Sequence, residues 1–360
     1  MLPKKIDIYI MRKMLGTYVL SILMVISIAI VIDITEKMDN FYQAELSLET
    51  VVMEYYVHFV PYYINLFSSL FTFISAIFVT SKLAYNSEII AMLAGGISFR
   101  RIMLPYMLSA AVIALFTFYI GSYVIPKGND KRLEFESKYI DNTPPEISLR
   151  NVQFRINDSD IAYMERFNVV NDIGYRFSLD SFDGKRLASR ITAQTIHYKG
   201  DENWLLLRYT KRDFDGLYEH LSSGDSLSLT IDMAPKDFMI IKNHHERLTN
   251  PELTGFIEEN TKRGRAGLNA YKLEYQKRFA LPFGSFILTL IGVSLSAKKV
   301  RGGKGFNMFV GLALSAIYIL CTLMSSTFTV KAGVNPVLAI WLPNIVFLGI
   351  GIVLYRKAPK

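Results

Sequence analysis

The sequence predicts an α-helical membrane protein with six transmembrane helices and an extracytoplasmic all-β domain inserted between the third and the fourth helix. Two observations support this fold class. The chain of 360 residues is 51% hydrophobic and 20% charged, with a mean hydropathy of +0.24, which is too apolar for an ordinary soluble domain. The charges are also unevenly spread, because residues 127–277 hold 23 Lys or Arg and 24 Asp or Glu.

Six stretches of the chain contain no Asp, Glu, Lys or Arg, and the shortest has 19 residues. A helix needs roughly 20 apolar residues to cross about 30 Å of hydrocarbon, so each stretch predicts one transmembrane helix. Three stretches precede residue 127 and three follow residue 278. They are 14–32, 55–81, 102–126, 279–297, 305–330 and 332–355.

The basic residues predict the orientation of these helices. If the N-terminus is cytoplasmic, the cytoplasmic segments hold fourteen Lys or Arg against two acids, Asp7 and Glu88. The short outer loops then hold two bases, Lys37 and Lys331, against six acids. The positive-inside rule therefore predicts cytoplasmic N- and C-termini and an extracytoplasmic insert. Because the excess of bases lines the membrane surface, no nucleic acid partner is expected.

The insert between the third and fourth helices is predicted to be β. Residues 188–214 contain two alternating runs around KGDEN, which is typical of a hairpin. Further short strands are predicted over 160–170, 175–182 and 225–233. Regularly spaced strands with turn signals favour a sandwich or an open barrel.

The chain returns from the insert through a predicted helix. TNPELTGFIEENTKRG (249–264) has a capping residue, Pro251 at the first helical position and acids nearby, which is typical of a helix start. The predicted domain limits are 1–126 for the first three helices, 127–250 for the β domain, 251–277 for a connecting helix and 278–360 for the last three helices.

The sequence contains no pattern for catalysis, a cofactor or a metal. His244 and His245 are adjacent but lack a Cys or carboxylate at a metal-ligand spacing, and the single cysteine, Cys321, lies in an apolar stretch. RGGKGF (301–306) lacks the Ser or Thr and the preceding strand of a phosphate-binding loop. No GxSxG or HExxH motif occurs. If the protein performs work, a partner must supply the energy.

The segment between the second and third helices is short, amphipathic and too polar to span a membrane. As a helix it would have an apolar side formed by Leu83, Ile90, Leu93 and Ile97, with Glu88 elsewhere. The pair Gly95-Gly96 would end the helix or let another backbone approach closely. Two interpretations remain open from periodicity: a helix resting on the membrane surface, or a docking helix whose glutamate meets a basic residue of a cytoplasmic protein.

Four stretches carry a resemblance to a known family. SEIIAMLAGGISFRRIMLP (87–105) resembles the signature of the lipopolysaccharide export permeases, the LptF/LptG family. PELTGFIEENTKRG (251–264) and YKLEYQKRFALPF (271–283) resemble the family's entry to its fourth helix. RGGKGFNMFVGLALSAIYIL (301–320) resembles its fifth helix. The order of three helices, a β insert and three helices covers the whole chain.

The resemblance implies a transport subunit rather than an enzyme. Such permeases pair with a second permease of the same family, and a cytoplasmic ATPase dimer binds their coupling helices. Lipopolysaccharide would be extracted from the inner membrane of a Gram-negative bacterium and enter the cavity between the first and fifth helices. It would then pass through a jellyroll-like periplasmic β domain to periplasmic β-jellyroll bridge proteins.

The resemblance also implies roles for particular residues. Residues 83–99 would be the coupling helix, and Glu88 matches the glutamate that docks the ATPase. The implied docking set is Ser87, Glu88, Ala91, Gly95, Arg100 and Arg101. The bases near the outer ends of helices, candidates for lipid contact, are Lys37, Arg278 and Lys331.

Two other classes of function remain open. The chain could be a permease-like subunit for another ATPase that moves lipoproteins or peptides, or a membrane scaffold or sensor whose β insert binds a ligand. The short inner loops disfavour the sensor, since they leave no room for a cytoplasmic signalling domain. The sequence does not distinguish between the two paired permeases or specify the saccharide of the cargo.

Overall fold

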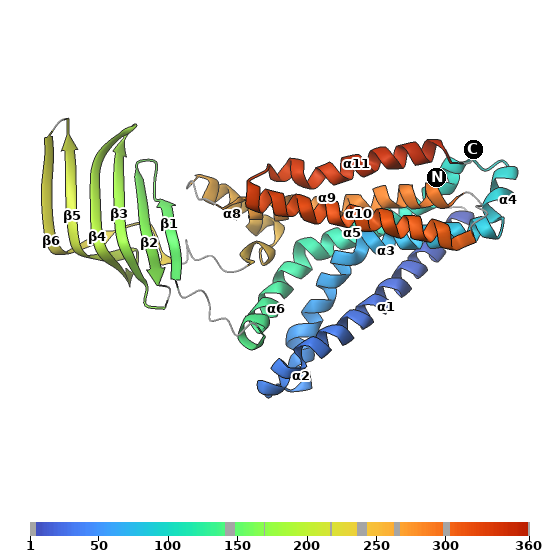
Figure 1. Ribbon diagram of the computed structural model, residues 1–360, viewed down its shortest axis with the longest axis horizontal. Coiled ribbons are helices and arrows are strands. Elements are labelled where there is room, and N and C mark those ends of the chain that lie inside the picture. Colours follow the sequence, from blue (N-terminus) through green and yellow to red (C-terminus); the bar gives the residue numbers. More distant parts are fainter. Residues whose placement is uncertain are drawn as a thin grey trace. The chain divides into compact units, whose positions relative to one another are not determined.

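The computed structural model describes residues 5–140, 148–168, 170–216, 218–235, 243–262, 267–297 and 303–358 (Figure 1). These residues form two compact units. The helical unit is drawn from Met1–Ile140, His245–Leu253 and Asn269–Lys360, and the sheet unit from Asp141–His244 and Thr254–Leu268.

The N-terminal half of the helical unit contains three long helical runs. The first is α1 (Lys5–Gln43), and a short helix, α4 (Glu88–Ala94), separates the second run from the third. The second run comprises α2 (Leu48–Thr50), the π-helical segment η1 (Val51–Tyr56) and α3 (Val57–Tyr85). The third comprises α5 (Phe99–Tyr119), the π-helical segment η2 (Ile120–Val124) and α6 (Ile125–Tyr139).

After the strands the chain forms the short helix η3 (His244–Glu246) and then α8 (Asn250–Lys262). Residues 250–253 of α8 belong to the helical unit and residues 254–262 to the sheet unit. The carboxylate of Glu252 accepts hydrogen bonds from the Thr249 backbone N–H and hydroxyl, at 2.8 and 2.7 Å. This contact caps the start of α8 and confirms the predicted helix start. Three long helices follow: α9 (Asn269–Ser296), α10 (Gly303–Ala332) and α11 (Pro336–Arg356).

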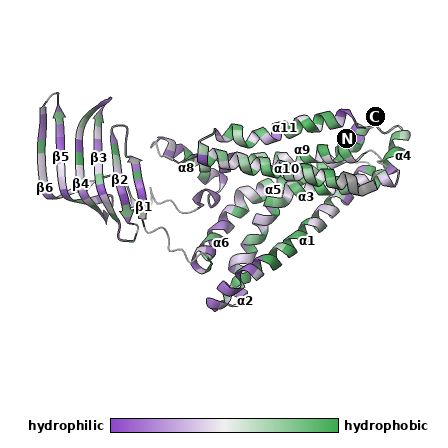
Figure 2. Cartoon of the chain, in the orientation of Figure 1, coloured by the Kyte–Doolittle hydropathy of each residue, from purple (hydrophilic) through white to green (hydrophobic). Residues whose placement is uncertain are grey.

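Six helices in the described part of the chain are long and apolar enough to cross a membrane, as predicted. Figure 2 shows α1, α10 and α11 as largely hydrophobic and α2 as hydrophilic. The first run has 39 residues and the third has 41, so at about 1.5 Å per residue both exceed the roughly 30 Å of a bilayer core. Both therefore extend beyond the hydrocarbon layer.

Helix α9 lies at the centre of the helical unit, where it contacts α3, α5, α10 and α11. In its most apolar window 61% of the residues are buried, whereas the figure is 17% in α1 and in α10. Packing within the helical unit thus leaves most of the apolar surface of α1 and α10 uncovered, which lipid or another protein must cover in a membrane.

The sheet has six antiparallel strands paired in chain order, so each strand lies beside its sequence neighbours (Figure 1). The strands are β1 (Ser148–Arg155), β2 (Asp160–Asn168), β3 (Ile173–Asp183), β4 (Arg186–Gly200), β5 (Asn203–Asp215) and β6 (Tyr218–Thr230). The predicted hairpin is confirmed, since β4 pairs with β5 and the turn lies between Gly200 and Asn203. Strand β1 was not predicted, and β6 begins seven residues before the predicted strand.

One face of the sheet carries a packed apolar core. Trp204, Met164, Phe167 and Leu206 are fully buried in it. The indole N–H of Trp204 donates a 2.7 Å hydrogen bond to the carbonyl of Met233, so the chain after β6 folds back over this face. The polar atom of the tryptophan is therefore satisfied inside the core.

Two finer predictions concern this region. The first residues of the insert, up to Tyr139, are helical, and the strands begin only at Ser148. The predicted connecting segment contains α8 and the first turns of α9 rather than one helix. The domain limits and the jellyroll-like description stay predictions.

Candidate docking site at helix α4

Helix α4 is held between α3 and α5 by two tight turns. Before it, Ser87 adopts a left-handed backbone with φ of +59°, which is uncommon for a residue other than glycine. After it, Gly96 has φ of +82°. The Gly96 N–H donates to the Leu93 carbonyl and the Ile97 N–H to the Met92 carbonyl, both at 3.0 Å. These two bonds form a Schellman motif, so the Gly-Gly pair ends the helix as predicted.

The predicted helix over 83–99 is much shorter in the structure. Residues up to Tyr85 belong to α3, and those from Phe99 belong to α5. The sequence groups Ile90 with Leu83, Leu93 and Ile97 on one apolar side, but in the structure Ile90 is exposed while Leu83 is buried. Ile89 is 1% exposed and Ile90 is 51% exposed, because the turn at Ser87 rotates α4 relative to α3.

The buried face of α4 joins it to α1, α3 and α5. Ile89 packs in one apolar cluster with Ile10 and Met14 of α1, and Met92 and Leu93 pack against the same cluster. Leu83, Phe99 and Ile102 complete its contacts with the flanking helices. The buried side chains of α4 thus share one apolar cluster with residues of three longer helices.

The opposite face of α4 is exposed and mainly apolar. It carries Ser87, Ile90, Ala91, Ala94 and Gly95, at the three- and four-residue spacings that place residues on one side of a helix. The predicted docking residues Ser87, Ala91 and Gly95 thus lie together on one accessible stripe. Their role in docking stays a proposal.

Glu88 lies at the start of α4 with its side chain 32% exposed. The Tyr9 hydroxyl donates a 2.8 Å hydrogen bond to its Oε2 atom, and the Asn86 amide donates one of 3.3 Å to Oε1. Lys13 lies 3.9 Å from Oε1, hydrogen bonds to the Tyr9 hydroxyl and lies 4.1 Å from the centre of the Tyr9 ring. Glu88 therefore has partners on α1 that the sequence did not predict.

The two adjacent arginines behave differently. Arg101 forms a 2.5 Å ion pair with Asp7, which is 2% exposed, and so ties the start of α5 to the start of α1. Arg100 is exposed, and among the described residues no acid lies within ion-pair distance of it. Only Arg100 of this pair therefore presents a free cation beside α4.

The three bases predicted to contact lipid have different surroundings. Lys37 forms a 2.7 Å ion pair with Asp33 and hydrogen bonds to the Tyr55 hydroxyl, with 17% of its side chain exposed. Tyr56 donates a 3.0 Å hydrogen bond to the other Asp33 oxygen. Lys331 is exposed and has no polar partner among the described residues. Lipid contact by these bases stays a prediction.

Arg278 is buried beside a small cavity of the helical unit. Its guanidinium donates to Glu274 Oε1 at 3.1 Å, to Asn250 Oδ1 at 2.9 Å and to the His245 carbonyl at 3.4 Å. The cavity has a volume of about 50 Å³ and is also lined by Glu246 and Lys277. Burial and the nearby Glu274 carboxylate raise the pKa of Glu246.

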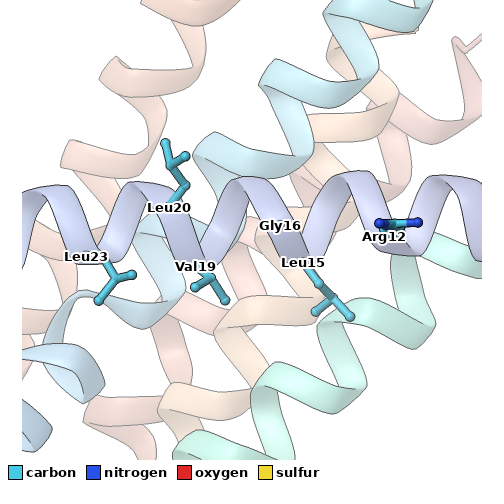
Figure 3. A pocket seen from close by; sticks show the side chains of 6 residues that line it. All are labelled: Arg12, Leu15, Gly16, Val19, Leu20 and Leu23. Carbon is cyan, nitrogen blue, oxygen red and sulfur yellow. The ribbon is translucent and has the colours of Figure 1, made fainter.

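An open hollow lies along the exposed side of α1 (Figure 3). It has a volume of about 680 Å³ and is lined by Arg12, Leu15, Gly16, Val19, Leu20 and Leu23. Apart from the neighbouring backbone of α1 itself, no described atom lies within 4 Å of the position that a Cβ atom would take at Gly16. The hollow is thus a surface feature of one helix, and its lining is almost wholly apolar.

Comparison with known proteins agrees with this architecture. The family model for the lipopolysaccharide export system permeases LptF/LptG matches residues 8–357. The chain belongs to the LptF/LptG family. It is similar to the lipopolysaccharide export system permease protein LptG of Escherichia coli strain K12, with 20% identity over 98% of each chain. The LptG protein of Escherichia coli O6:H1 matches with the same identity and coverage.

Membership in the LptF/LptG family fixes the broad class of the protein. The family implies a transport permease rather than an ATPase. Together with the six apolar helices, it indicates a multi-pass protein of the inner membrane. Within the helical unit, α4 is a short helix with one buried face and one accessible face.

Sequence reasoning found α4 and Glu88 but missed the partners of Glu88 on α1. Tyr9 is separated from Glu88 by 79 positions, so no local pattern relates them. The ion pair between Asp7 and Arg101 was also missed, but here the sequence held a signal. Asp7 is an acid in a basic, apolar N-terminal segment, and an acid near a membrane helix usually has a paired base.

Proposed function

We propose that the chain is one permease subunit of an ATP-driven lipopolysaccharide exporter, with the ATPase supplied by a cytoplasmic partner. The observation that carries the proposal is the two-sided construction of α4. Ile89 anchors the helix in the apolar cluster, while Ile90, Ala91 and Ala94 form an exposed apolar stripe. A stripe of this kind is suited to a groove on another protein.

Docking would place the ATPase against the exposed stripe, with Glu88 at its edge meeting a basic residue of the groove. Movement of the ATPase would then shift α4 and, through Ile89, the cytoplasmic ends of α1, α3 and α5. Packed helices respond to such a push by discrete shifts rather than continuous deformation. Closure of an ATPase dimer can thus be converted into movement of transmembrane helices.

A second permease of the same family would cover part of the helical unit. The exposed apolar surface of α1, including the hollow around Gly16, supports such a pairing, because packing within the chain leaves it uncovered. Lipopolysaccharide would occupy the space between the two subunits. Lys37, Arg278 and Lys331 remain candidates for its anionic groups, and Lys331 alone among them is exposed without a described polar partner.

The sheet unit would receive the lipid on the periplasmic side and pass it to β-jellyroll bridge proteins. Strand β6 supports this step, since among the described strands it pairs with β5 alone and most of its residues are exposed. The free edge of such a strand can pair with a strand of another protein. The orientation with both termini in the cytoplasm follows from the distribution of basic residues.

Charge reversal at Glu88 tests this function. In Glu88→Lys we expect a normal level of the permease, weak retention of the ATPase during purification and loss of transport. A charged contact that becomes buried on docking typically contributes about 2–5 kcal/mol, which corresponds to roughly 30-fold or more in affinity. Glu49→Lys is the matched control, because Glu49 is exposed in α2 and lies outside the proposed docking stripe.

Full ATPase retention and normal transport in Glu88→Lys would contradict the docking role. The lipid that remains bound to the purified wild-type complex tests the cargo independently. Lipopolysaccharide identified by mass spectrometry would support the proposal, whereas a lipoprotein or a peptide would favour a permease for another cargo.

A further inference from the structure

A row of six residues crosses the whole sheet at one level and takes no part in strand pairing. Between β1 and β2, Arg150 pairs with Arg166 and Val152 pairs with Met164. Asn151 and Glu165, which lie between these two pairs, are not paired with each other. The same interruption continues through every later pair of strands. The remaining members of the row are Arg176, Gln194, Arg208 and Asp225.

The interruption turns two consecutive side chains of a strand away from the apolar core. In β2, Met164 and Phe167 are both buried, while Glu165 and Arg166 between them are both exposed. A regular strand would alternate and would place one of the two inside. The face opposite the core is called the outer face. At this level it carries two consecutive side chains of a strand instead of one.

At three of the six positions in this row the backbone adopts a left-handed conformation. Asn151, Arg176 and Arg208 have left-handed φ values of +53°, +51° and +50°. Glycine would take this conformation without steric cost, and asparagine at little cost, whereas arginine is uncommon there. A row that served only to bend the sheet would not require arginine, so the side chains themselves need an explanation.

Two further arginines face each other without a counter-ion. Arg150 on β1 is the direct cross-strand partner of Arg166 on β2, and both are exposed. Among the described residues, no acid lies within ion-pair distance of either one. Like charges placed directly opposite on neighbouring strands destabilise a sheet. This pair is therefore an unfavourable arrangement in the free protein.

A hollow of about 590 Å³ lies over this pair. The Arg166 guanidinium lies 4.5 Å from the centre of the Tyr175 ring, and Arg176 is neutralised by Glu165 at 2.7 Å. The lining residues are Arg150, Asn151, Glu165, Arg166, Tyr175, Arg176 and Gln194. The lining thus has two positive charges in excess, together with amide groups that can donate hydrogen bonds.

We propose that this hollow on the outer face of the sheet binds a phosphate ester, held between Arg150 and Arg166. Guanidinium groups bind phosphate oxygens with paired hydrogen bonds, and an anion between them would remove their mutual repulsion. The cation–π contact with the Tyr175 ring helps to hold the Arg166 guanidinium in place beside the hollow. The phosphate belongs either to a soluble phosphorylated molecule or to the headgroup of a lipid.

The site is separate from the apolar core on the other face of the sheet and does not depend on ATPase docking. Hydrogen exchange of the full-length protein in detergent tests it directly, with inorganic pyrophosphate as the probe. We expect peptides that cover β1, β2 and β3 to exchange more slowly as pyrophosphate is added. In the double variant Arg150→Gln/Arg166→Gln the affinity for pyrophosphate should fall at least about tenfold.

Arg190→Gln is the matched control. Arg190 is exposed on the sheet but is bound by both oxygens of Asp180, at 2.6 and 2.7 Å, so its change should leave pyrophosphate affinity within about twofold. Without the probe, Arg150→Gln should slow exchange in β1 and β2, because it removes the repulsion. Faster exchange in that variant would assign Arg150 a purely structural role and overturn the proposal.

Two arms identify the source of the phosphate. One uses pyrophosphate with the protein in phosphatidylcholine nanodiscs, and the other uses nanodiscs that also contain phosphatidic acid, without pyrophosphate. Protection in the first arm alone assigns a soluble ligand, and protection in the second arm assigns a lipid headgroup. Protection that persists in the double variant, or is absent from both arms, would overturn the proposal.

Discussion

The hydroxyl of Tyr9 lies 2.8 Å from the carboxylate of Glu88, and this contact joins the first transmembrane helix to the start of α4. Tyr9 and Glu88 are far apart in sequence, and α4 is connected through the chain only to α3 and α5. The hydrogen bond therefore adds a polar contact to the apolar packing of Ile89 with Ile10 and Met14, which also joins α4 to α1. Any force applied at Glu88 would act on α1 as well as on the flanking helices.

Tyr9→Phe tests this attachment. The change removes one hydrogen bond to a partly exposed carboxylate, which is worth about 1 kcal/mol or slightly more, and leaves the ring in place. We expect normal ATPase retention but a lower yield of exported lipid for each ATP hydrolysed. Tyr42→Phe, at an exposed position near the other end of α1, is the control. Equal yields in wild type and Tyr9→Phe would contradict a role in transmission.

Ile89 and Ile90 provide a matched pair on opposite faces of α4. Ile90→Asp should leave the permease level unchanged and reduce ATPase co-purification, because the side chain is exposed on the proposed docking stripe. Ile89→Asp should reduce the permease level itself, since it places a charge within an apolar cluster. Immunoblots of membranes and of affinity-purified complexes measure both effects. A loss of permease in Ile90→Asp would show that α4 is oriented differently in the cell.

The Asp7–Arg101 ion pair should be important for stability. Asp7 is almost fully buried, and breaking a buried pair from one side typically costs about 3–5 kcal/mol. We expect Asp7→Ala to lower the melting temperature of the purified protein and its level in membranes. The double variant Asp7→Ala/Arg101→Met should recover part of the loss, because it removes the uncompensated cation. A double variant less stable than Asp7→Ala would argue against this account.

Labelling with a membrane-impermeant thiol reagent tests the orientation. In a Cys321→Ser background, a cysteine in place of Asp201 should react in intact spheroplasts, because the turn between β4 and β5 is predicted to be periplasmic. A cysteine in place of Gly303 should react only after the membrane is permeabilised. The reverse pattern would overturn the orientation derived from the basic residues.

Glu246 predicts a pH dependence of stability. Its pKa is raised in the folded protein, mainly by burial and then by Glu274, against the opposing effect of Lys277, His245 and Arg132. The folded state then binds the proton more tightly than the unfolded state, so this residue's contribution favours folding at low pH and is lost as pH rises through the raised pKa. Glu246→Gln should flatten this decline in thermal unfolding curves from about pH 4.5 to 8. If the stability of Glu246→Gln fell with pH as steeply as that of the wild type, other titratable groups would be responsible for the decline.

The broad architecture could be predicted because it depends on composition. Six stretches free of charge define the helices, and the alternation around KGDEN defines one hairpin, without knowledge of any tertiary contact. Strand β1 was missed because its residues include two arginines and an asparagine and lack a regular alternation. The strand conformation of β1 is supported by its pairing with β2. The sequence pattern of β1 alone carries no information about that pairing.

The candidate docking site was only partly predictable for a related reason. The glycine pair predicted the end of α4. The left-handed turn at Ser87 was not predicted, and with it Ile89 rather than Ile90 is buried. A single residue with a left-handed backbone changes the direction of the helix that follows it. Serine rarely adopts this conformation, so the residue type does not predict the turn. The partners of Glu88 depend on how α1 packs, which no pattern within residues 83–105 specifies.

The strand order of the sheet has a consequence for biosynthesis. Each strand pairs only with the strands next to it in the chain, so its contacts are local and its contact order is low, which favours rapid folding. Strands β1 to β6 can assemble one after another as they emerge, before the last three transmembrane helices have been made. The sheet unit would then be largely formed while α9, α10 and α11 are still being synthesised, which shortens the time that its apolar face and free edges are open to aggregation.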